Sequence, residues 1–158
     1  MKHGIFQVRI NDTNGPHFVG GKGLKQGDPH SPLLFNLVAD VFSKMLVKAV
    51  NNGLIGGLLP HAIPGGVASL QYADDTILVA NADSTQLEHI KNLLLHFAAY
   101  TGLKVNYSKS TMISINTPED KMHFLSDLLG CQIGTPSLQY LGLPLASTNL
   151  GWKTTYLF

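Results

Sequence analysis

The stretch that most constrains the fold is Leu70–Ala80, LQYADDTILVA, which places Asp74 and Asp75 inside an otherwise apolar, β-branched segment. Burying even one unpaired carboxylate is costly, so a fold with both side chains in its core is excluded. β-Branched and aromatic residues on both sides of Ala73 favour two strands, and aspartate is a common turn residue. We therefore predict a β-hairpin over residues 67–80, with the two carboxylates at its turn.

Composition limits the class of protein. The chain has 158 residues, 44% of them hydrophobic, which is enough for one domain with a buried core. The single cysteine excludes an internal disulfide, and no apolar run reaches the roughly 18 residues of a membrane span. The net charge of +1 means that any nucleic-acid-binding surface must be local. We expect a soluble, intracellular protein with no membrane partner, and no residues carry an address that chooses between nucleus and cytoplasm.

Turn-forming and capping residues divide the chain into elements. The apolar face expected of the first helix comprises Leu34, Leu37, Val38, Val41, Met45 and Leu46. The other expected elements before residue 102 are strands at Ile5–Ile10 and His17–Gly20, joined by a turn over 11–16, and helices from Ser31 to about Val50 and from about Ser84 to Thr101. After it we expect a strand at Lys104–Ile115, a short helix opened by Thr117–Asp120 and ending at Gly130, and a last strand or strand edge at Tyr140–Leu145. This alternation predicts an α+β fold of the split βαβ type, with helices packed on one face of a sheet.

Two carboxylates at one turn have two explanations. The first is a hairpin tip with both acids in water. In the second, the stiff strands hold the carboxylates together, and a divalent cation neutralises them. A pair of Mg²⁺ ions about 3.5–4 Å apart activates an attacking hydroxyl and stabilises a leaving phosphate. The hairpin alone leaves both explanations open.

Four motifs occur together in one order along the chain. They are GLKQGDPHSPLLF (Gly23–Phe35), QYADD (Gln71–Asp75), GLKVNYSKS (Gly102–Ser110) and YLG (Tyr140–Gly142). With them the chain closely resembles the palm of reverse transcriptases, the RNA-directed DNA polymerases, of plant-type non-LTR (LINE-like) retrotransposons. The resemblance covers about residues 5–145 of a partial domain spanning 1–158, and the tail 146–158 fits the family poorly.

The resemblance implies roles for residues of the hairpin and of the loop before the first helix. Asp74 corresponds to the aspartate that binds both catalytic Mg²⁺ ions, for which Mn²⁺ can substitute, and Asp75 to its less directly coordinating neighbour. Tyr72 corresponds to a residue near the primer end. Gln26 and Gly27 match the loop that lies against the incoming dNTP and the RNA template.

The remaining motifs match parts of the family that contact the nucleotide and the DNA primer. Lys109 corresponds to a lysine that neutralises or protonates the leaving pyrophosphate, although a solvated lysine at a strand end explains it equally well. A primer-grip role and a bent core strand are the two explanations of the YLG motif, which comprises Tyr140, Leu141 and Gly142.

The family's third metal-binding aspartate comes from a first palm strand that has no counterpart in this sequence, and the fingers and thumb are also missing. We therefore expect an incomplete palm that binds Mg²⁺ weakly and is inactive alone, with poor solubility or self-association caused by uncovered sheet edges and apolar helix faces. The alternatives are a catalytically dead fragment that binds nucleic acid through Lys25, Lys104 and Lys109, and an unselected retroelement relic.

Overall fold

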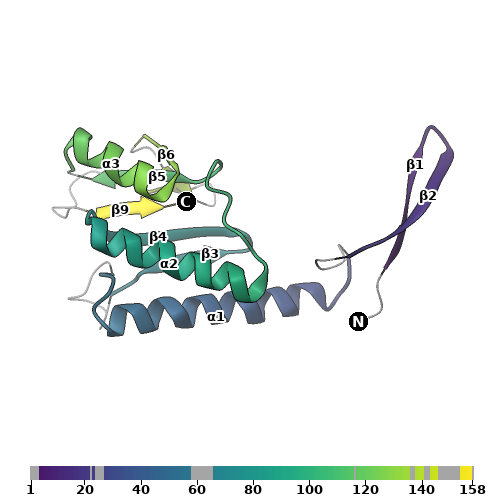
Figure 1. The fold of residues 1–158 in the computed structure, drawn as a ribbon, viewed down its shortest axis with the longest axis horizontal. Coiled ribbons are helices and arrows are strands. Elements are labelled where there is room, and N and C mark those ends of the chain that lie inside the picture. The colour runs from purple at the N-terminus through teal and green to yellow at the C-terminus, as the bar shows by residue number, and fades with distance from the viewer. Residues whose placement is uncertain are drawn as a thin grey trace. The chain divides into compact units, whose positions relative to one another are not determined.

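The computed structural model has an α+β fold in two compact units, Met1–Asp40 and Val41–Phe158, whose boundary falls within the first helix (Figure 1). No helix among the described residues is long and apolar enough to cross a membrane. The residues that the structure describes are 4–21, 23, 27–57, 66–115, 117–135, 138–140, 143–145 and 154–157.

The first unit contains an antiparallel hairpin of β1 (Ile5–Ile10) and β2 (Thr13–Val19). Its turn consists of Asn11 and Asp12, with φ values of 47° and 62°, as a two-residue turn of type I′ requires. The predicted turn over residues 11–16 was therefore too long. The pairing is irregular between Gln7 and Arg9, where β2 contains one residue more than β1.

Helix α1 (Ser31–Asn51) begins at the predicted serine, but its predicted apolar face is partly wrong. Leu37 and Val41 are 64% and 50% exposed. The buried side chains of α1 are Phe42, Leu46 and Ala49, which share a helix face at spacings of four and three residues. Packing selects this face, since the centroid of the Phe42 ring lies 4.9 Å from the centroid of the Phe97 ring in the next helix.

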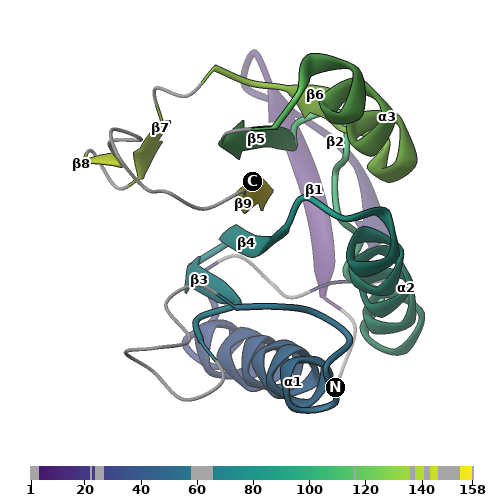
Figure 2. The same cartoon turned by 90° about the vertical axis from the view of Figure 1, so that its left-hand side faces the viewer.

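The second unit is built on a five-stranded sheet with the order β3-β4-β9-β5-β6 (Figure 2). All neighbours are antiparallel except β5 and β6. The central strand comes from the tail for which the sequence predicted no element. The strands are β3 (Ser69–Tyr72), β4 (Asp75–Asn81), β9 (Thr154–Leu157), β5 (Thr111–Ile115) and β6 (Gln132–Ile133).

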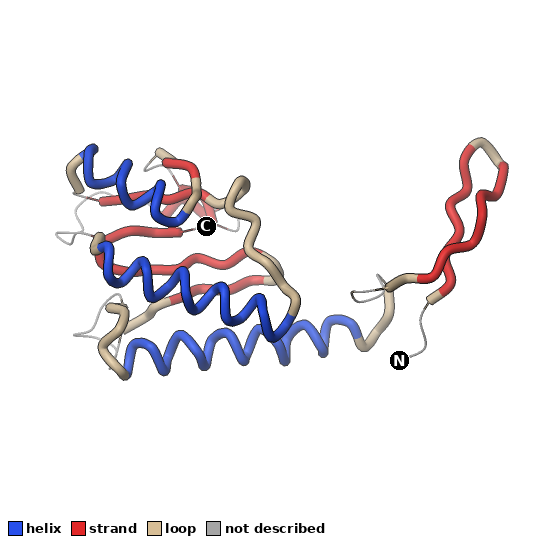
Figure 3. Tube along the Cα trace, in the orientation of Figure 1, coloured by secondary structure: helices blue, strands red, loops and turns tan. Residues whose placement is uncertain are grey.

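Two further helices, α2 (Ser84–Thr101) and α3 (Glu119–Leu129), lie where the sequence predicts them (Figure 3). The side chain of Asp83 accepts a hydrogen bond from the backbone N–H of Gln86 at 3.1 Å and so caps the start of α2. Gly102 ends this helix with a φ of 78°, a conformation that glycine adopts without a Cβ clash.

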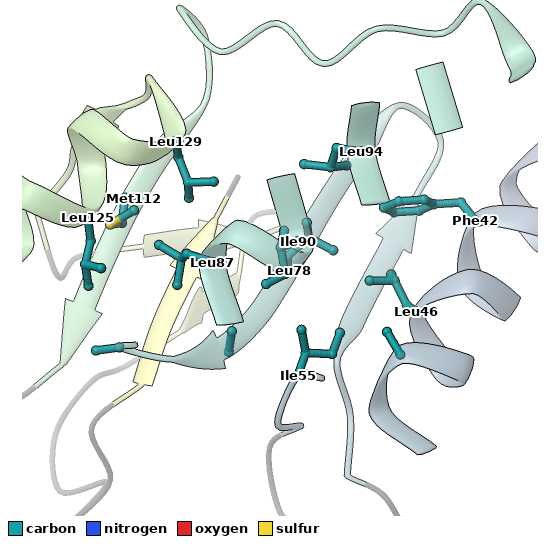
Figure 4. Close-up of a cluster of buried hydrophobic side chains, with 13 residues drawn as sticks. Phe42, Leu46, Ile55, Leu78, Leu87, Ile90, Leu94, Met112, Leu125 and Leu129 are labelled. Carbon is teal, nitrogen blue, oxygen red and sulfur yellow. The ribbon is translucent and has the colours of Figure 1, made fainter. Parts of the chain in front are cut away.

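One buried cluster joins all three helices to the sheet (Figure 4). Its members from the strands are Leu78 and Ala80 of β4 and Met112 of β5. Most of the other members come from the three helices. The helical members are Phe42, Leu46, Ala49, Leu87, Ile90, Leu94, Leu125 and Leu129. The expected layer of helices packed on a sheet is therefore present.

Two predicted strands differ from the observed ones. The strand expected at Lys104–Ile115 is shorter, because turns occupy the chain up to Ser110 and β5 starts at Thr111. The single strand expected at Tyr140–Leu145 is a small antiparallel pair, β7 (Leu138–Tyr140) and β8 (Leu143–Leu145).

Candidate functional site

The two adjacent aspartates lie at the turn of the β3–β4 hairpin. Tyr72 pairs with Asp75, so Ala73 and Asp74 form a two-residue turn. Ala73 has a φ of 50°, a region in which an L-residue with a Cβ is unfavourable. This conformation closes the hairpin tightly and places Asp74 at its tip.

The hairpin combines exposed carboxylates with a buried support. Asp74 and Asp75 are exposed, and neither side-chain carboxylate makes a hydrogen bond or an ion pair within the described part of the chain. Two residues further along β4, the segment Ile77–Ala80 is buried. Two solvated acids are thus fixed at the end of a rigid strand, where their oxygens are accessible to a ligand.

Lys109 lies in a turn before β5 and not at a strand end as predicted. Its backbone N–H donates to the carbonyl oxygen of Asn106 at 3.0 Å. The hydroxyl of Ser110 donates to the same carbonyl at 2.9 Å, and that of Ser108 donates to the Asn106 side chain at 2.7 Å. These bonds favour the turn over continued strand pairing and leave the side chain of Lys109 exposed.

The turn with Lys109 and the turn with the aspartates lie at the same end of the sheet (Figure 1). Both β4 and β5 are antiparallel to β9, and Leu78 and Met112 both pair with Leu157. Asp75 precedes Leu78 by three residues, and Lys109 precedes Met112 by three. With two strand spacings of about 4.8 Å between them, β4 and β5 are about 10 Å apart across the sheet. An exposed lysine and the two carboxylates therefore lie in turns at the same end of the sheet.

Tyr107, in the same turn, packs near the only cysteine of the chain. Burial, and secondarily the charge of Cys131, raises the pKa of the Tyr107 phenol. Burial also raises the pKa of the Cys131 thiol, against the opposing effect of backbone hydrogen bonds from Cys131 and Met112. Both groups are therefore neutral near pH 7, and Lys109 supplies the positive charge of this turn.

The other predicted site residues are only partly described. Gly27 has a φ of 82° shortly before α1 and belongs to the first unit, whereas Gln26 lies outside the described residues. Tyr140 ends β7, and Leu141 and Gly142 lie outside the described residues. The structure thus brings Tyr72, both aspartates and the turn with Lys109 to the same end of one sheet. The roles of all the predicted site residues stay predictions.

A metal site would depend on the hairpin aspartates. Among the described residues, no group of three or more His, Cys, Asp or Glu side chains is placed to hold a metal ion. Strand β9, which pairs with β4 on the side away from β3, has the sequence Thr-Thr-Tyr-Leu and contains no acidic residue. Two carboxylates can supply oxygen ligands to a hard cation, but water or phosphate must complete its coordination.

Sequence reasoning missed the strand Thr154–Leu157, which separates the two turns of this site. Its local signal was a run of β-branched and aromatic residues, Thr-Thr-Tyr, which favours strands.

Comparison with known proteins identifies relatives over almost the whole chain. Residues 2–145 match the family described as reverse transcriptase (RNA-dependent DNA polymerase). A retrovirus-related Pol polyprotein from the type-1 retrotransposable element R2 of Popillia japonica is 33% identical over 144 residues, which are 85% of this chain and 22% of that protein. The polyprotein from the type-2 element R2DM of Drosophila melanogaster is 31% identical over 141 residues, 84% of this chain and 12% of that protein. The chain thus spans less than a quarter of the length of these relatives.

Proposed function

Because this chain belongs to the reverse transcriptase (RNA-dependent DNA polymerase) family, as a partial domain of a non-LTR retrotransposon, we propose that it is the palm-like part of a polymerase that copies an RNA template into DNA. The observation that carries the proposal is the pair of exposed carboxylates at a rigid turn, with the Lys109 turn at the same end of the sheet. A plant-type parent element stays a prediction.

Asp74 and Asp75 hold divalent metal in this proposal, with Asp74 as the residue that contacts both ions. When bound, a pair of Mg²⁺ or Mn²⁺ ions would activate a primer hydroxyl for attack and stabilise the leaving phosphate. The exposed position of both carboxylates supports this assignment, because a dNTP could approach them from solvent. Tyr72, 60% exposed on the adjacent strand, is assigned to the primer end.

Lys109 is assigned to the leaving pyrophosphate. A triphosphate bound at this end of the sheet would have the aspartates and the lysine within one site, and the lysine would supply positive charge to the leaving group. Gln26 and Gly27 are assigned to the nucleotide and template. The YLG motif is assigned to the primer grip, comprising Tyr140, Leu141 and Gly142.

Two carboxylates without a third make a weak metal site, so we propose that this chain does not polymerise alone. Isothermal titration calorimetry should show no tight binding of Mg²⁺. Tight, stoichiometric binding of two Mg²⁺ ions would contradict this part of the proposal and would require a third ligand.

The experiment that tests the metal assignment is a titration of the isotope-labelled chain with Mn²⁺, followed by NMR line broadening. We expect the amide signals of residues 72–76 to broaden first, and Asp74→Asn to reduce this broadening at least severalfold. Asp127→Asn, which neutralises an exposed aspartate on α3, is the matched control and should leave it unchanged. Broadening that spreads evenly over all exposed acids would refute the site.

Primer extension on an RNA template, with Mg²⁺ and then Mn²⁺, separates the alternatives. Extension that disappears in Asp74→Asn would mean that the chain is an active polymerase with a third ligand elsewhere. Salt-dependent binding of the primer–template without extension or local Mn²⁺ broadening would indicate the catalytically dead fragment. Absence of all three signals in a folded chain would indicate the relic.

A further inference from the structure

The five-stranded sheet consists of two pairs of strands that β9 joins. β3 pairs with β4 on one side, and β5 pairs with β6 on the other. In the described part of the chain β4 and β5 do not pair with each other, and each forms four residue pairs with β9. Without β9, the edges of β4 and β5 would face each other across a gap as wide as one strand.

Both strands that flank β9 pack against the helices. Leu78 of β4 and Met112 of β5 belong to the same buried cluster as α2 and α3 (Figure 4). The two helices are also joined directly, because Nζ of Lys91 on α2 donates to the carbonyl oxygen of Leu128 on α3 at 2.6 Å. The space between β4 and β5 is therefore bounded by a packed helical layer.

A segment that occupies the space between β4 and β5 needs mainly an extended backbone that can pair with both strands. β9 is four residues long, Thr154–Leu157, and it pairs through its backbone on both sides. It follows β8 in the sequence after residues 146–153. An unpaired strand edge accepts any extended segment with matching register, and exchange of an identical segment between copies is a low-cost route to dimers.

We propose that the space between β4 and β5 is an acceptor site for a strand, and that β9 of a second copy occupies it in a strand-exchanged dimer. The second copy has the same sequence, so it forms the same pairs with β4 and β5 as the strand of the same chain does. The monomer, in which β9 pairs within its own chain, and the strand-exchanged dimer thus contain equivalent backbone pairing. A higher protein concentration therefore favours the dimer. This proposal does not depend on polymerase activity.

Disulfide trapping between two differently marked chains tests the exchange. Ser114 of β5 pairs with Thr155 of β9, and paired residues in antiparallel strands lie within the Cα distance that a disulfide needs. In a Cys131→Ser background, one full chain carries Ser114→Cys and the other Thr155→Cys. The equimolar mixture is unfolded, refolded at high concentration and oxidised. We expect a disulfide-linked heterodimer with twice the mass of one chain, which increases with the refolding concentration.

Two controls make each outcome decisive. The pair Ser114→Cys with Thr154→Cys should not crosslink, because neighbouring residues of a strand point to opposite faces. A single chain with both Ser114→Cys and Thr155→Cys should form an internal disulfide on refolding at low concentration. If this internal bond forms and the mixture gives no heterodimer, β9 stays with its own chain and the proposal is refuted. If neither forms, β9 does not occupy this site, and the proposal also fails.

Discussion

At the scale of single residues, Ala73 links the geometry of the candidate site to its stability. It is the first residue of the hairpin turn and has a positive φ, which glycine adopts far more easily than alanine. Backbone strain of this kind persists where the surrounding structure enforces it. Here the pairing of Tyr72 with Asp75 enforces it.

We predict that Ala73→Gly stabilises the fold by about 0.5–1 kcal/mol, because relief of the left-handed strain exceeds the entropy that glycine gains in the unfolded chain. Urea unfolding followed by circular dichroism measures the change. The matched control is Ala99→Gly on the exposed side of α2, where the same substitution should cost about 1 kcal/mol. Destabilisation by Ala73→Gly would show that the turn is not strained.

Cys131 provides a prediction about pH. Burial raises the pKa of its thiol above the ordinary value of 9.0, so the folded state favours the protonated form. This contribution to stability is complete below pH 9 and declines as the pH rises through the raised pKa, because the unfolded chain ionises first. As the pH rises above 9, the free energy of unfolding should therefore fall more steeply in the wild type than in Cys131→Ser. Equal slopes would contradict the effect of burial.

At the scale of elements, caps account for the accuracy with which α2 could be predicted. Asp83 and Gly102 satisfy backbone groups that the helix leaves unpaired at its two ends. These interactions involve residues within four positions of each other. They are therefore present in the local sequence before any tertiary contact forms.

We predict that Asp83→Ala destabilises the second unit by about 1 kcal/mol, because the side-chain acceptor for the Gln86 N–H is lost. Asp83→Asn keeps an acceptor at the cap and should differ from the wild type by only a few tenths of a kcal/mol. Thermal and urea unfolding of the two variants measure the difference. A loss of the same size in both would assign the effect to the charge and not to the cap.

At the scale of the whole molecule, the two units differ in how much apolar surface they bury. The buried residues among those described begin at Phe42, and the hairpin of the first unit exposes Ile5, Ile10 and Phe18 by half or more. A two-stranded hairpin is only marginally stable by itself. The two units should therefore differ in their opening free energies.

Amide hydrogen exchange measured by mass spectrometry tests this contrast. We predict that β1 and β2 exchange within about tenfold of an unfolded peptide, while residues 77–80 and 87–94 are protected about a thousandfold or more. A urea-unfolded sample supplies the reference rates. Protection of the hairpin equal to that of β4 would mean that a partner, such as a second copy, covers its apolar side chains.

By itself, the sequence determined the features whose signals are local: the hairpin at Asp74 and Asp75, the bounds of α2 and α3, and the motifs that identify the family. Only the tertiary structure decided that α1 buries Phe42 and not Val41, that Lys109 lies in a turn, and that Thr154–Leu157 becomes the central strand. Caps and turns depend on neighbours within a few residues, whereas strand order and the choice of a buried face depend on contacts between distant segments. The carboxylates and the lysine share one end of the sheet for this second reason, through a strand that lies outside the residues 2–145 matched by the family.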